Sequence, residues 1–80
     1  MRVWQVGSVR LGRKWLRYYL LRSMEPQRGY GICVTCGSDA ALIPEITSSE
    51  AEVRQLLGAM IRGRVTPVTV RDIVEDWLCG

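Results

Sequence analysis

The first half of the chain carries the alternation of apolar and polar positions that is typical of strands. Residues 14–22 and 30–36 alternate in this way, and both contain aromatic or β-branched residues that favour extended structure. A short basic helix over 14–22 is the competing interpretation. Residues 40–47 predict a return strand after a hairpin loop at 37–39. Pro44 cannot donate to a ladder, so we expect an edge strand or a bulge there.

Residues 1–12 give a mixed pattern. Residues compatible with a strand are interrupted by Gly7, Ser8 and Gly12, so an extra strand and a loosely ordered arm both remain open. We therefore expect an N-terminal arm or extra strand over residues 1–12 and a single small domain over residues 13–80.

The second half of the chain predicts two amphipathic helices. Apolar residues recur at helical spacing over 53–61 and again over 70–78. Two helices of similar length joined by a short turn form a hairpin, which buries its apolar stripes against a sheet. The sequence thus predicts an α+β fold: a three-stranded antiparallel sheet, with a possible extra N-terminal strand, followed by a two-helix hairpin packed on one face.

Capping residues predict where these helices begin and end. Ser49 and Glu52 fit a capping box, in which Ser49 caps the first helix and Glu52 reaches back. Gly63 fits the position just after the end of this helix. Thr66 followed by Pro67 predicts the start of the second helix.

The charge of the chain is divided unevenly. Residues 1–30 contain seven basic residues and one acidic residue, whereas residues 31–80 contain four basic and seven acidic residues, and the net charge is +3. A basic end on an acidic body indicates a nucleic-acid or anionic partner. The simpler interpretation is a set of strand arginines that face water.

We expect neither a leader nor a membrane segment in this chain. The apolar stretch from Trp15 to Leu21 is interrupted by Arg17 and lacks a small-residue cleavage site. No run approaches the roughly 18 apolar residues of a membrane span. We expect a cytoplasmic protein that does not bind membranes and whose three cysteines are mostly reduced.

The one recognisable chemical motif is Cys33-Val34-Thr35-Cys36. A zinc site and a thioredoxin-type redox pair both use this spacing, but around a tight turn or at a helix start. In a strand, positions i and i+3 point to opposite faces, so the two thiols diverge. The pattern therefore favours two structural cysteines that do not bridge each other.

The sequence indicates that the protein is not an enzyme. It contains no histidine, and it shows no pairing of a nucleophile with a base. Asp72, Glu75 and Asp76 lie opposite the apolar stripe of their helix, which is typical of a solvated face. We predict no catalytic residue, no cofactor and no metal site.

A partner surface is predicted on residues 14–22, because bulky side chains occupy both faces of this strand. Leu16, Tyr18 and Leu20 would face the core, which leaves Trp15 and Tyr19 on the other face with basic neighbours. The candidate partner-binding residues are Arg13, Trp15, Arg17, Tyr19, Leu21 and Arg22. A protein partner or self-association is expected, and nucleic-acid binding by the same basic aromatic strand is the alternative. Residues 2–11 could instead fold back and cover this face.

Four short motifs occur in a recognisable order. They are Tyr18-Tyr19-Leu20-Leu21, Tyr30-Gly31-Ile32, Thr66-Pro67-Val68, and Asp72-Ile73-Val74-Glu75-Asp76 followed by Trp77. Over about residues 17–78 this order resembles a family of short uncharacterised bacterial proteins, classed as a domain of unknown function. The resemblance implies a small cytoplasmic bacterial protein without an assigned activity, and it supplies no site residue. The sequence thus predicts an interaction or regulatory module, with a nucleic-acid-binding adaptor as the alternative.

Overall fold

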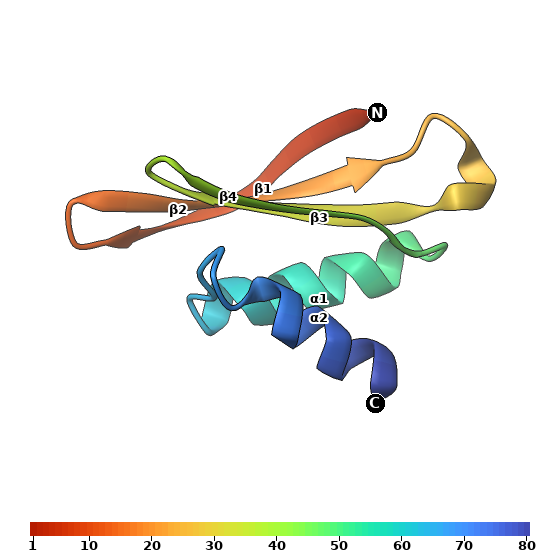
Figure 1. The fold of residues 1–80 in the computed structure, drawn as a ribbon. Helices are drawn as coiled ribbons and strands as arrows, with labels where there is room; N and C mark the ends of the chain where they lie inside the picture. Colours follow the sequence, from red (N-terminus) through yellow and green to blue (C-terminus); the bar gives the residue numbers. More distant parts are fainter.

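The computed structural model describes residues 1–80, apart from the side chain of Pro26. Its elements in chain order are β1 (Arg2–Leu11), β2 (Lys14–Arg22), a 3-10 turn (Pro26–Arg28), β3 (Tyr30–Cys36), β4 (Asp39–Thr47), α1 (Glu50–Arg62) and α2 (Val70–Cys79). The strands form one antiparallel sheet in the order β1-β2-β3-β4, and both helices lie on the same face of it (Figure 1). The predicted α+β class with an antiparallel sheet and two helices is confirmed, but the sheet has four strands, where the sequence predicted three and left an extra N-terminal strand open.

The fourth strand is β1, which runs along β2 from the pair Arg2–Arg22 to the pair Leu11–Lys14. A two-residue turn joins the strands, and Gly12 takes the left-handed conformation that such a turn requires, with φ 63°. The register shifts between Gln5 and Gly7, so β1 contains a bulge. A Cβ atom at Gly7 would lie 2.7 Å from Cδ1 of Ile61, so this glycine allows α1 to approach the sheet.

The other edge strand, β4, is irregular where Pro44 interrupts it. Residues 44–46 stand opposite the single residue Gly31, and Glu45 adopts a left-handed φ of 59°. The prediction of an edge strand or a bulge at Pro44 is confirmed on both counts. The preceding turn contains two residues rather than the predicted three, because Cys36 already pairs with Asp39.

The core lies between the sheet and the helices. Its buried residues are Leu16, Tyr18, Leu20, Ile32, Val34, Cys36, Val53, Leu56, Leu57, Met60, Val70 and Val74. The hydroxyl of the fully buried Tyr18 donates a hydrogen bond of 2.8 Å to the carbonyl oxygen of Val65, in the loop between the helices. This bond ties the helical hairpin to the centre of the sheet.

Replacing Tyr18 by phenylalanine is expected to lower the free energy of unfolding by about 1 kcal/mol at pH 7, because the Val65 carbonyl loses its donor while the ring volume stays. Burial raises the pKa of Tyr18 above its ordinary value of 10.0, and the charge of Cys36 acts in the same direction. This contribution to stability is complete below the unfolded-state pKa of about 10 and is lost as pH rises through the folded-state pKa. Denaturant unfolding should therefore show that the difference in free energy of unfolding between the wild type and Tyr18→Phe is smaller above pH 10 than at pH 7. Tyr19→Phe is the control, and its free energy of unfolding should match that of the wild type.

The helix ends differ from the predicted caps in detail. Ser49 caps α1 by accepting from the Glu52 amide at 3.2 Å, as predicted. The Glu52 carboxylate does not return this bond; it accepts instead from the hydroxyl of Thr47 at 2.8 Å, and that hydroxyl accepts from the Ser49 amide. This arrangement satisfies the same amides with one more residue.

The end of α1 lies one residue beyond its predicted position. Gly63 remains right-handed and Arg64 takes the left-handed conformation, with φ 52°. The amides of Val65 and Arg64 bond to the carbonyls of Met60 and Ile61, which is a Schellman arrangement. The second helix begins at Val70 and not at Pro67, because residues 67–69 form a turn.

Candidate interaction surface

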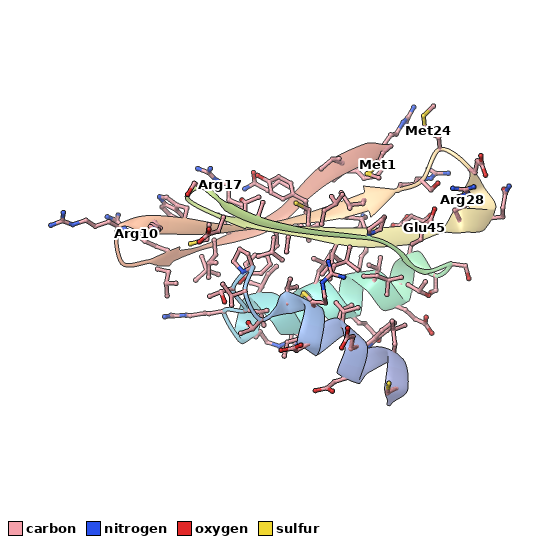
Figure 2. All side chains as sticks on the ribbon, viewed as in Figure 1. Met1, Arg10, Arg17, Met24, Arg28 and Glu45 are labelled. Carbon is pink, nitrogen blue, oxygen red and sulfur yellow. The ribbon has the colours of Figure 1, made fainter. Side chains whose placement is uncertain are left out.

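The two helices leave the opposite face of the sheet uncovered, and we call this the open face. Strand register places on it Val3, Gln5, Ser8 and Arg10 of β1, Trp15, Arg17, Tyr19 and Leu21 of β2, Cys33 and Thr35 of β3, and Ala40 and Leu42 of β4. Figure 2 shows Arg17, Met1 and Met24 on the side of the sheet away from the helices. Residues 2–11 do not fold back over this face, because they extend the sheet sideways as β1.

The open face is built in rows that cross the sheet. The row of Gln5, Tyr19, Cys33 and Leu42 is mostly apolar, and Leu42 is 50 % exposed. The neighbouring row towards the hairpin turn contains Ser8, Arg17, Thr35 and Ala40 and is polar. The pair Arg10 and Trp15 lies beyond it. An apolar band therefore adjoins a basic end.

Trp15 is the most prominent exposed aromatic residue of this face. Its side chain is 45 % exposed, and the guanidinium carbon of Arg10 lies 6.0 Å from its ring centroid. This distance fits a cation–π contact, which holds the arginine over the ring. Tyr19, four residues further along the strand on the same face, is half-buried.

Two of the six predicted partner-binding residues lie differently from the prediction. Leu21 is on the open face but is only 2 % exposed, so it packs against neighbouring residues and offers almost no surface to a partner. Arg22 shares the alternation of Leu20 and points to the helix side, where its charge acts on Glu50 at the start of α1. The hydrogen bond from Arg54 holds the pKa of the Glu50 carboxyl below its ordinary value, and the charge of Arg22 acts in the same direction. Arg13 lies exposed in the turn between β1 and β2.

Three residues of the surface were missed at the level of sequence. Arg10 and Val3 reach the open face through β1, whose extended pairing the sequence left undecided. Leu42 arrives there through the register of β4 with Cys33. Alternation along β4 was the available signal for Leu42, whereas Arg10 and Val3 required knowledge of the bulge.

The surface carries a concentrated positive charge. Residues 1–22 contain six basic residues and no acidic residue. Across the side chains that the structure describes, ion pairs join Arg28 to Glu25 at 2.9 Å and to Glu45 at 3.3 Å, and Arg54 to Glu50 at 2.9 Å. None of these pairs uses a basic residue of the β1–β2 hairpin, so its charge is available to an anionic partner.

A hollow lies beside the other end of the hairpin. It has a volume of about 400 Å³ and is lined by Met1, Arg2, Arg22, Ser23 and Met24. Arg2 and Arg22 are direct cross-strand partners. Like charges placed directly opposite each other on neighbouring strands are destabilising, so an acidic group in this hollow would be favoured.

The two cysteines of the predicted motif lie on opposite faces, as alternation indicates. Cys36 is buried in the core, whereas Cys33 is half-buried on the open face, and both are free thiols. Burial raises the pKa of the Cys33 thiol. In the described part of the chain, no three side chains of metal-ligating type lie together.

Brief alkylation of the native protein is expected to label Cys79 first, because this thiol is exposed near the end of α2. Cys33 should follow slowly, since its raised pKa leaves less thiolate at neutral pH, and Cys36 should react last. Mass spectrometry after peptide digestion measures the order. Preferential labelling of Cys33 or Cys36 would contradict this assignment.

Comparison with known families gives one match. The model of a family described as "Family of unknown function (DUF6514)" matches residues 8–80. The match starts inside β1, earlier than the resemblance in the motifs, and so includes most of the hairpin. Neither the curated proteins nor the solved structures contain a match. In the described part of the chain, no helix is long and apolar enough to cross a membrane.

Proposed function

The chain belongs to the Family of unknown function (DUF6514), and from the geometry of its open face we propose that it is a non-enzymatic protein-interaction module that binds an acidic protein segment. The observation that carries this proposal is the uncovered sheet face, on which the exposed Trp15 and an apolar band adjoin Arg10 and Arg17, which form no ion pair with the side chains that the structure describes.

Apolar exposure supports a protein partner. Val3, Trp15 and Leu42 are 55 %, 45 % and 50 % exposed on the open face, although they are large apolar side chains. Several large apolar side chains exposed on one uncovered sheet face, with polar neighbours such as Arg17, are typical of an interaction site. Tryptophan, tyrosine and arginine are also the residue types that dominate interface energetics.

Charge supports an acidic partner. The strands β1, β2 and β3 contain no acidic residue, and Arg10 and Arg17 lie on the open face itself. An acidic segment would be steered towards this face and held by charge-assisted contacts. A second copy of the chain would instead bring two basic hairpins together, which disfavours self-association through this face.

The alternative of nucleic-acid binding has less support from the geometry. Stacking of bases needs exposed aromatic rings on a basic platform. Tyr18 is fully buried in the core, Tyr19 is half-buried, and Arg10 lies over the ring of Trp15. An exposed apolar band beside the arginines fits a peptide chain better than a phosphate backbone.

A binding titration tests the proposal. The probe is a fluorescein-labelled peptide of alternating Glu and Val, compared with a Lys–Val peptide and with single-stranded oligo-dT. We expect the acidic peptide to bind. The substitution Arg17→Glu should lower the affinity by about tenfold or more, equivalent to about 1.4 kcal/mol of binding free energy. Arg71→Glu is the matched control, because Arg71 is an exposed residue of α2 and lies far from the open face.

Three outcomes would overturn the proposal. The first is absence of binding to the acidic peptide at low salt, and the second is tighter binding to oligo-dT than to that peptide. The third is an equal loss of affinity in Arg17→Glu and Arg71→Glu, which would show a non-local charge effect. Sedimentation of the wild type at several concentrations should give a monomer, and a dimer dissociated by Arg17→Glu would replace the acidic partner by a second copy.

A further inference from the structure

We propose that the acidic segment binds as an added β-strand along the free edge of β1, an inference that rests on the function proposed above. Strand addition is a recurrent mode of peptide recognition, in which main-chain hydrogen bonds supply affinity and neighbouring side chains supply specificity. The two edges of this sheet differ in a way that assigns the site to β1.

The edge at β4 is blocked. Pro44 lacks an amide hydrogen, and Glu45 takes a left-handed φ of 59° within an irregular segment. Proline, bulges and charges are the devices by which native proteins prevent pairing at an edge. A partner strand would meet an interrupted row of donors there.

The edge at β1 is long and contains no proline. The strand spans ten residues, and its apolar side chains are unusually exposed, with Trp4 at 41 % and Leu11 at 40 %. Its bulge lies between Gln5 and Gly7, so the segment from Gly7 to Leu11 pairs regularly. A regular, apolar edge of this kind is a template for another strand.

The amides that face this edge follow from the turn. In a two-residue hairpin the pair that flanks the turn, here Leu11 and Lys14, exchanges ladder hydrogen bonds, and successive pairs then alternate. Arg10 and Ser8 therefore belong to pairs that do not exchange these bonds. Their amides are directed away from β2 and towards the free edge.

The charges select an acidic strand over a second copy of β1. A second copy of β1 would bring only basic charges, Arg2 and Arg10, to this edge and no acidic residue. Bringing like charges together at an interface opposes association. An acidic strand would instead meet Arg10 near the turn and the cross-strand pair Arg2–Arg22 beside the hollow.

Amide hydrogen exchange of the whole chain, measured by NMR with and without the Glu–Val peptide, tests the inference. Exchange at Ser8 and Arg10 should slow by tenfold or more when the peptide is bound. Ala40 is the internal control, because it occupies the equivalent position on β4 next to the turn and its exchange should not change. Ser8→Pro should lower the affinity for the peptide by tenfold or more, whereas Ala40→Pro should leave the affinity unchanged.

The failures of the two proposals are distinguishable. If the peptide shifts the Trp15 indole resonance while exchange at Ser8 and Arg10 stays the same, the segment binds the open face without pairing and strand addition is wrong. If Ser8→Pro binds as tightly as the wild type, strand addition is also wrong. If the peptide does not bind the wild type at all, the proposed function itself fails.

Discussion

Replacement of Gly31 by alanine is expected to destabilise the fold by about 3 kcal/mol or more, which is a large share of the stability of a small domain. A Cβ atom at this position would lie 2.3 Å from the carbonyl oxygen of Ile43 and 2.5 Å from the Cα of Pro44. Both are backbone atoms of the irregular part of β4, so the clash cannot be relieved by rotating a side chain. The strand pair must separate locally to admit the methyl group.

Gly58→Ala is the matched control for this prediction. Gly58 lies within α1, and the nearest atom to an added Cβ would be Nη1 of Arg62 at 3.4 Å, the end of a flexible side chain. Alanine is favoured over glycine inside a helix by about 0.5–1 kcal/mol, so this variant should be slightly more stable than the wild type. Urea unfolding followed by tryptophan fluorescence measures both variants. A loss below about 0.5 kcal/mol in Gly31→Ala would contradict the tight approach of β4.

Replacing Leu57 by alanine is expected to lower the free energy of unfolding by about 2–5 kcal/mol. Leu57 is fully buried, and it belongs to the cluster in which α1 packs against the sheet. The change removes buried methyl groups and leaves a cavity in a small core. Leu78→Ala is the control, since Leu78 is 57 % exposed on α2 and its truncation should cost less than about 0.5 kcal/mol. Similar losses in both variants would contradict the assignment of the core.

The sequence predicted the strands and helices that bury one face continuously. The segments 14–22 and 30–36 keep one alternation from end to end, and their observed bounds agree with the prediction. The stripe over 53–61 is likewise continuous, and its residues Val53, Leu56, Leu57 and Met60 are buried. In each case one periodic signal and one packing surface coincide.

The first strand could not be predicted because its alternation changes phase. Before the bulge, Trp4 pairs with the core residue Leu20, whereas after it Gly7 and Val9 pair with Tyr18 and Leu16. No single period therefore runs through residues 2–11. Gly7, which argued against a strand, leaves room for Ile61: a Cβ atom here would lie 2.7 Å from Cδ1 of that side chain, a contact between segments far apart in the sequence.

The apolar stripe predicted over residues 70–78 is only partly buried in the structure. Val70 and Val74 are buried, but Ile73 and Leu78 remain 39 % and 57 % exposed. Figure 1 shows the C-terminal end of α2 directed away from the sheet, which explains this difference. The direction of a helix relative to a sheet depends on packing between elements, and the periodicity of one helix does not encode it.

The candidate surface was predicted in part. Alternation along β2 correctly separated Trp15, Arg17 and Tyr19 from the core face. The same alternation places Arg22 with Leu20 on the helix side, next to Arg2 and the hollow rather than beside Trp15. The burial of Leu21, at 2 % exposure, depends on the surrounding strands and was not accessible to a pattern within one strand.

Trp15→Ala gives the most direct test that the open face is a binding surface. Two quantities are measured on the same variant: the free energy of unfolding in urea and the affinity for the Glu–Val peptide. We predict that the free energy stays within about 0.5 kcal/mol of the wild type, because Trp15 is 45 % exposed, while the affinity falls by about tenfold or more. A loss of stability of about 2 kcal/mol or more, or an unchanged affinity, would show that Trp15 serves the fold and not a partner.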